Sequence, residues 1–126
     1  MSDYRIYKKS VTEVLEYLSS YDFQKVAWFE NDQGLMYSFN ENVSDLFDDF
    51  YLKKALYEDG VIVFSSRADH ALRDLNEAVE KINGRDYREE VLIALPEMQI
   101  VRQKAAYALA LIQASDGKES TVEIIE

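Results

Sequence analysis

The chain has 126 residues, of which 48% are hydrophobic, four are glycine, one is proline and none is cysteine. A chain of this length can bury one core, so we expect a single compact domain over residues 1–126. The lack of cysteine excludes disulfides, thiolate catalysis and sulfur-ligated zinc, and it favours a reducing, cytoplasmic setting. The first residues lack the apolar core of a signal peptide, and no apolar run approaches the about 18–20 residues of a membrane span, which predicts a soluble protein.

The formal net charge is −10, from 24 acidic and 14 basic residues. Nucleic acid and anionic membranes repel such a surface, so we expect neither as a direct partner. A basic protein would be attracted to it. The alternative is that the acidity serves solubility alone.

Acidic and aromatic side chains are concentrated between residues 26 and 52. This segment holds six carboxylates, no lysine or arginine, and seven of the chain's sixteen aromatic residues. Negative charge beside ring surface is typical of a recognition surface. The predicted partner-binding residues are Trp28, Glu30, Asp32, Tyr37, Glu41, Asp45, Asp48 and Asp49.

The first half of the chain predicts two helices separated by a hairpin. Ser10 and Glu13 form a capping box before a helix over about 11–20. Two runs rich in β-branched and aromatic residues, 23–30 and 35–39, flank a loop that ends in glycine, which predicts an antiparallel hairpin. Asn42 is a candidate N-cap for a second helix that ends at Gly60.

The second half is predominantly helical in pattern. The apolar run 61–64 predicts a strand buried on both faces. Ser66 and Asp69 resemble a capping box at the start of an amphipathic helix that Asn83 and Gly84 end.

A further helix is expected from Asp86. Pro96 either kinks it or lies in the first turn of a final helix, which ends near Ala114. Residues 121–125 could add an edge strand or fray. We therefore expect an α+β fold in which a small antiparallel sheet, the hairpin plus one or two further strands, packs against about five helices, with a helical C-terminal half.

No catalytic motif stands out in the sequence. His70 is the only histidine and, near Asp69 and Asp74 in a first helical turn, is expected to be solvated or capped. Ser65 and Ser66 follow a predicted strand and precede a helix, but they lack the glycines of a nucleophile elbow, and Ser66 is better explained as an N-cap. We expect no catalytic residues, no metal site and no cofactor.

In charge and size the chain resembles the immunity proteins of bacterial nuclease toxins. The resemblance implies a small inhibitor that covers the basic active site of a toxin. A phage-type DNA mimic is a related alternative, although a mimic favours longer rows of carboxylates than this chain has. A second alternative is a homodimeric regulatory or structural subunit joined through Ile100, Tyr107 and Leu111, and a third is an enzyme with an unrecognised pocket.

Overall fold

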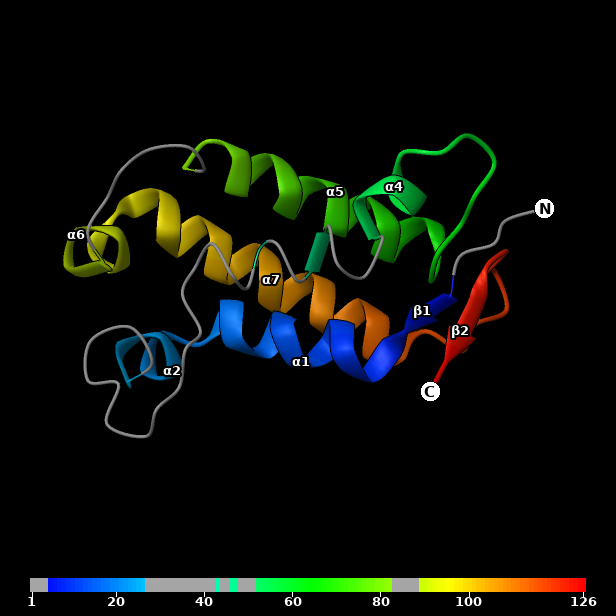
Figure 1. Cartoon of the computed structure of the whole chain (residues 1–126), viewed down its shortest axis with the longest axis horizontal. Coiled ribbons are helices and arrows are strands. Elements are labelled where there is room, and N and C mark those ends of the chain that lie inside the picture. Colours follow the sequence, from blue (N-terminus) through cyan, green and yellow to red (C-terminus); the bar gives the residue numbers. More distant parts are fainter. Residues whose placement is uncertain (1–4, 27–42, 44–45, 48–51, 83–88) are drawn as a thin grey trace.

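The computed structural model is mostly helical, and its longest helix, α7 (Pro96–Ala114), lies between α1 (Lys8–Ser19) and α5 (Ser66–Glu80) (Figure 1). Both flanking helices pack directly on α7. The residues that the structure describes are 5–26, 43, 46–47, 52–82 and 89–126.

Three further short helices lie within the described residues. At one end of the molecule, α2 (Tyr21–Lys25) contacts α6 (Glu89–Ala94), which immediately precedes α7 (Figure 1). α4 (Leu52–Leu56) packs against α5.

The sheet is small and parallel, which overturns the predicted α+β fold with an antiparallel sheet. β1 (Arg5–Tyr7) pairs with β2 (Glu123–Ile125), with Ile6 opposite Ile124 in the register. It lies at the end of the molecule opposite α2 and α6 (Figure 1). An edge strand and fraying were the two alternatives for residues 121–125, and the structure has a strand, β2, at Glu123–Ile125. Its partner β1 lies almost a whole chain length away in sequence.

The start of the predicted hairpin is also wrong. Phe23 lies in α2, because the Ser20 side chain accepts a hydrogen bond from the Phe23 amide at 3.1 Å and caps a helix at this point. The rest of the predicted hairpin, residues 27–39, lies outside the described residues.

The apolar run 61–64 is not a strand either. The amides of Val63 and Phe64 donate to the carboxylate of Asp69, at 2.7 and 3.0 Å, rather than to a neighbouring strand. The backbone of this run contacts the residues after α7 at two points: the Ile62 carbonyl accepts from the Thr121 amide at 2.8 Å, and the Phe64 carbonyl accepts from the Ser115 hydroxyl at 3.2 Å. Val63 and Phe64 are nonetheless buried, so the sequence correctly indicated burial of these two residues, whereas the strand was wrong.

The long helices match their predicted positions, although two caps differ. α1 begins at Lys8, directly after β1, so Ser10 lies inside the helix instead of capping it. The Ser65 side chain caps α5 by accepting from the Ala68 amide at 3.0 Å, and Ser66 is the first helical residue. Pro96 begins α7 as a separate helix, because its missing amide costs nothing in the first turn.

The predicted ends of two helices coincide with glycines in turns. Gly60 follows the turn after α4 with φ +79°, and Gly117 follows α7 with φ +77°. Glycine adopts this left-handed conformation without the steric cost of a Cβ. What precedes α4 in the predicted second helix falls largely on residues outside the described ranges.

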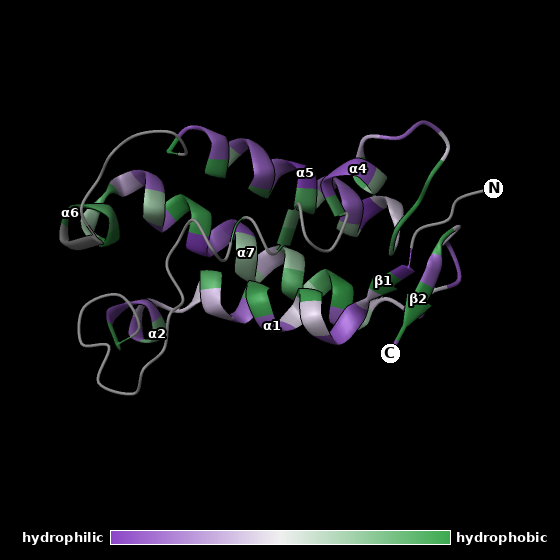
Figure 2. Ribbon diagram, viewed as in Figure 1, coloured by the Kyte–Doolittle hydropathy of each residue, from purple (hydrophilic) through white to green (hydrophobic). Residues whose placement is uncertain are grey.

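The core lies on both sides of α7. In Figure 2 the hydrophobic residues of α1 and α5 line the sides of these helices that face α7. Each leucine buried in full contributes roughly 1.5–3 kcal/mol, and the alanines of α7 let its neighbours approach closely. The buried residues include Val11, Leu15, Leu18, Leu72, Leu75, Val79, Met98, Val101, Ala105, Ala108 and Ile112. Across the part of the chain described, no helix combines the length and the apolar character that crossing a membrane requires.

Candidate functional site

The predicted partner-binding residues fall on the acidic segment, residues 26–52, which the structure describes only in part. Because all eight lie outside the described residues, their joint placement stays a prediction. They are Trp28, Glu30, Asp32, Tyr37, Glu41, Asp45, Asp48 and Asp49.

The structure describes five residues of the acidic segment, and all but the first belong to the core: Val26, Val43, Leu46, Phe47 and Leu52. Val43, Leu46 and Phe47 are buried in the same hydrophobic cluster as the long helices. Phe47 is therefore not a surface ring, although it was one of the aromatic residues that marked this segment as a recognition surface. The acidic segment is tied to the main core near its C-terminal end.

The N-terminal end of the acidic segment follows α2, which is fixed by the buried side chain of Gln24. Its amide nitrogen donates to the carbonyls of Tyr17 and Leu18, at 3.1 and 2.9 Å, and so satisfies the last turn of α1. Its amide oxygen accepts from Nε of Arg102 at 2.8 Å. One glutamine therefore joins α2 to the end of α1 and to α7.

Arg102 is buried although it carries a charge. Its Nη2 donates to the carbonyl of Ile93 at 2.6 Å, near the end of α6, and its guanidinium lies 5.1 Å from the ring centre of Tyr21. Burial lowers the pKa of Arg102, while Tyr21 acts in the opposite direction. No carboxylate of the described residues forms an ion pair with it. Carbonyl dipoles at the end of α6 and the Tyr21 ring stabilise the cation instead.

The C-terminal end of the acidic segment leads into α4, which polar contacts hold against α5. Arg73 donates to the carbonyl of Leu56, the last residue of α4, at 3.2 Å. Asn76 donates to the hydroxyl of Tyr57 at 3.1 Å, and Lys53 pairs with Glu80 at 3.1 Å. Both ends of the acidic segment thus adjoin short helices that side-chain hydrogen bonds hold in place.

An open hollow lies along the outer side of α4. It has a volume of about 710 Å³, and it is lined by Lys53, Lys54, Tyr57 and Glu58. Charged and aromatic side chains therefore meet solvent just after the acidic segment.

A second buried charge among the described residues, Asp69, fixes the backbone at the opposite end of the molecule. Its two carboxylate oxygens accept separately from the Val63 and Phe64 amides. Burial raises the pKa of Asp69, and those two hydrogen bonds and the charge of Arg73 act against the rise. Asp69 fixes the bend that leads into α5.

The residues considered for catalysis do not come together. The His70 side chain is 72% exposed and lies 3.6 Å from Asp74, as expected for a solvated histidine. Ser65 is occupied as the cap of α5. Where the chain is described, no three histidine, aspartate or glutamate side chains gather in a way that could hold a metal ion.

Charge is distributed unequally between the acidic segment and the rest of the chain. The segment carries six acids and no base, which leaves 18 acids and 14 bases on the other 99 residues. Several of those bases lie beside acids: Arg5 is 3.3 Å from Glu123, and Lys118 is 3.6 Å from Asp116. The net charge of −6 on 27 residues therefore exceeds the −4 on all the others.

Sequence reasoning missed the buried polar residues Gln24 and Arg102. A signal for Arg102 was present, because it lies four residues after Met98 and three before Ala105, within the apolar stripe of the final helix. A charged residue in such a stripe indicates a buried polar contact. Gln24 gave no comparable signal, since its neighbours were assigned to a strand.

Comparison of the chain with protein-family models, with curated proteins and with solved structures gives no match in any of the three. We infer function from the charge, burial and contacts of the chain itself.

Proposed function

We propose that the protein is a binding protein whose acidic segment, residues 26–52, occupies the cationic site of a basic protein partner. The observation that carries this proposal is the unequal charge distribution: 27 residues hold six acids and no base, whereas acids and bases are mixed elsewhere. A solubilising surface requires no such concentration of one sign.

The physical basis is electrostatic steering combined with aromatic anchoring. Concentrated charge speeds the encounter with an oppositely charged partner, and tryptophan and tyrosine supply much of the affinity once they are desolvated. The side-chain contacts of Gln24 and Arg73 hold the helices at the two ends of the segment. Such fixed ends reduce the conformational entropy that binding would cost.

The partner class that fits best is a nuclease toxin, since an enzyme that binds phosphate backbones needs a cationic site. On this proposal the chain is an immunity protein that covers that site and blocks access of nucleic acid. The lack of cysteine is compatible with a reducing compartment, and we place the complex in the cytoplasm of a bacterium.

The test is capture of partners by the tagged protein from its native lysate, at low and at high salt. We expect one basic protein at low salt, less of it at high salt, and more than about a tenfold loss with the triple variant Trp28→Ala, Asp48→Lys, Asp49→Lys. The matched control is Tyr7→Ala, Glu16→Lys, Glu119→Lys, which changes one ring and two charges outside the segment and should leave capture intact.

Identification of the captured protein leads to a direct assay. A nuclease whose activity is lost on addition of one equivalent of wild-type protein, but not of the triple variant, supports the immunity function. Full binding by the triple variant would exclude the acidic segment as the site. A partner that is basic but has no nuclease activity would retain the binding function and reject the toxin class.

A further inference from the structure

The side of α7 away from α1 exposes large apolar residues. Ile100 is 45% exposed and Tyr107 is 51% exposed. They are seven residues apart, so they lie on one stripe of the helix, about 10 Å apart along its axis. Between Ala105 and Ala114 α7 has no charged residue, which is typical of a helix covered on all sides.

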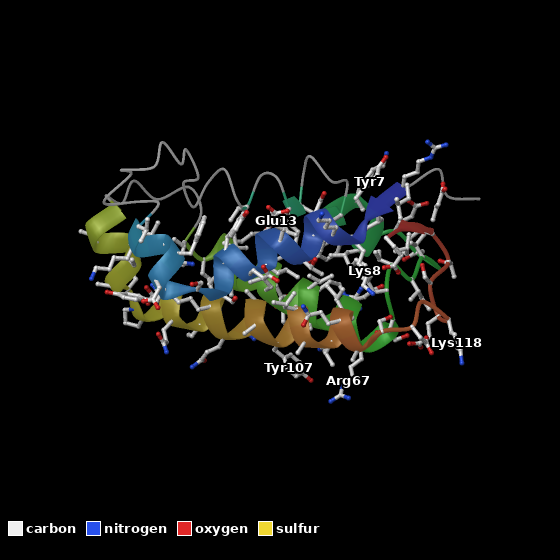
Figure 3. The ribbon with its side chains drawn as sticks, turned by 90° about the horizontal axis from the view of Figure 1, so that it is seen from below. Tyr7, Lys8, Glu13, Arg67, Tyr107 and Lys118 are labelled. Carbon is white, nitrogen blue, oxygen red and sulfur yellow. The ribbon has the colours of Figure 1, made fainter. Side chains whose placement is uncertain are left out.

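Ile100 lies beside a groove, and Tyr107 presents its ring further along the same face. The groove, of about 120 Å³, runs between α5 and α7; Ala78 and Ile100 form its apolar part. Tyr107 lies two helical turns further along α7, where its hydroxyl accepts a hydrogen bond from Arg67 of α5 at 3.4 Å. Figure 3 shows Tyr107 and Arg67 on the same side of the molecule, opposite Tyr7 and Glu13.

Charge also differs between the two ends of this face. The groove is lined by three carboxylates, those of Asp74, Glu77 and Glu97, and by two lysines. At the Tyr107 end the guanidinium of Arg67 is exposed. The same face thus has, at one end, an apolar hollow whose rim carries one more acid than base and, at the other end, an aromatic ring beside a cation.

From this arrangement we propose that the α5/α7 face binds a second copy of the chain about a two-fold axis. The axis passes between the two α7 helices, perpendicular to them and level with the midpoint between Ile100 and Tyr107, so that the two helices run antiparallel. It places Tyr107 of each copy over the groove of the other and Arg67 of each copy near the other's Glu77. Such a contact is isologous, with every interaction made twice.

A second copy suits this face better than a basic or an acidic partner. Both signs of charge are present on it, so a partner of one sign would meet repulsion at one end. A two-fold operation instead brings opposite signs together at both ends and covers both exposed apolar residues. The proposal is independent of the acidic segment, because it rests on residues of α5 and α7 alone.

The first test is the mass of the full chain in solution by light scattering over a dilution series. We expect twice the 14.6 kDa of the chain at high concentration. Tyr107→Glu should raise the dissociation constant more than about tenfold. The matched control is Tyr7→Glu, since Tyr7 is 50% exposed on β1 and lies outside the proposed contact. A wild-type chain that is monomeric throughout, or a control that dissociates as the Tyr107 variant does, would overturn the proposal.

The second test examines the two-fold geometry by charge reversal. Arg67→Glu and Glu77→Arg should each weaken the dimer alone, because each places like charges opposite one another twice. An equimolar mixture of the two variants should form a heterodimer with both charge pairs restored. Circular dichroism checks that both variants fold. If the mixture assembles no better than either variant, this register of the two chains is wrong.

Discussion

Asp69 and Arg102 are both buried charges, but they are satisfied at different ranges. Asp69 accepts from the amides of Val63 and Phe64, only six and five residues before it. Arg102 donates to Gln24, 78 residues away, and to Ile93 in the preceding helix. Each charge uses dipoles of uncharged groups rather than an ion pair within the described residues.

The two charges therefore have different structural roles, one local and one long-range. Asp69 sets a local backbone bend, which any loss of its carboxylate would release directly. Arg102 holds α2 and α6 to α7, so it determines how the end of the molecule that carries α2 is assembled. Only Arg102 acts on a helix that leads into the acidic segment, and we expect only its loss to affect both stability and partner binding.

The largest effect is expected for Asp69→Ala, which leaves two buried amides without an acceptor. We expect a loss of about 3 kcal/mol in the free energy of unfolding, measured by urea denaturation. The control Asp59→Ala, in an exposed turn, should change it by less than about 0.5 kcal/mol. Equal losses in the two variants would contradict the structural role of Asp69.

The pH dependence of Asp69 sharpens this point. Its pKa is raised above the ordinary 3.8, so the folded protein binds the proton more tightly than the unfolded chain. The contribution of Asp69 to the free energy of unfolding is therefore greatest below pH 3.8, and it declines as the pH rises through the pKa of the folded state. The free energy of unfolding of the wild type, minus that of Asp69→Asn, should therefore fall as the pH rises over this range. A difference that rises with pH would contradict the direction of the pKa shift.

The next effect is expected for Arg102→Ala, at about 2 kcal/mol, because Gln24 and the Ile93 carbonyl lose their donor while the cost of burying a charge is removed. A double-mutant cycle with Gln24→Ala should show coupling of about 1 kcal/mol. The cycle with Asp69→Ala should be additive within about 0.5 kcal/mol. Strong coupling between Asp69 and Arg102 would show that the two charges are not independent.

A smaller loss, about 1 kcal/mol, is expected for Ser65→Ala, which removes the cap of α5 next to the Asp69 bend. The matched control Ser66→Ala removes the same hydroxyl group from the adjacent residue. It should change the free energy of unfolding, measured by thermal denaturation, by only a few tenths of a kcal/mol. A larger loss for Ser66→Ala than for Ser65→Ala would show that Ser66 caps the helix instead.

The smallest effect is expected for an exposed charge. Arg5 pairs with Glu123 across the two strands, and both side chains are mostly in water. Arg5→Ala should cost less than about 0.5 kcal/mol, and the difference should vanish at high salt. A loss comparable to that of Arg102→Ala would mean that burial does not determine the contribution of charge in this protein.

The sequence predicts what short-range pattern determines. The spacing of Leu72, Leu75 and Val79, or of Met98, Val101 and Ile112, specifies an amphipathic helix, and these helices are confirmed. The run 61–64 shows the limit, since four apolar residues indicate burial but do not specify a strand.

Long-range partners could not be predicted. Nothing in the sequence around Arg5 points to Glu123, or around Arg102 to Gln24, because tertiary packing brings these residues together. For the acidic segment, composition is sufficient to predict the concentration of charge and of aromatic rings. It does not predict that Phe47 is buried, which only the structure shows.

The pairing of β1 with β2 bears on the order of folding. Arg5 and Glu123 close a loop that contains nearly the whole chain, and the entropy cost of closing a loop grows with its length. Contacts within and between neighbouring helices form over shorter separations, so we expect the strands to pair after the helices have brought them close. The same reasoning makes them the first to separate, and the amide of Ile6 should exchange with solvent faster than amides in the middle of α7.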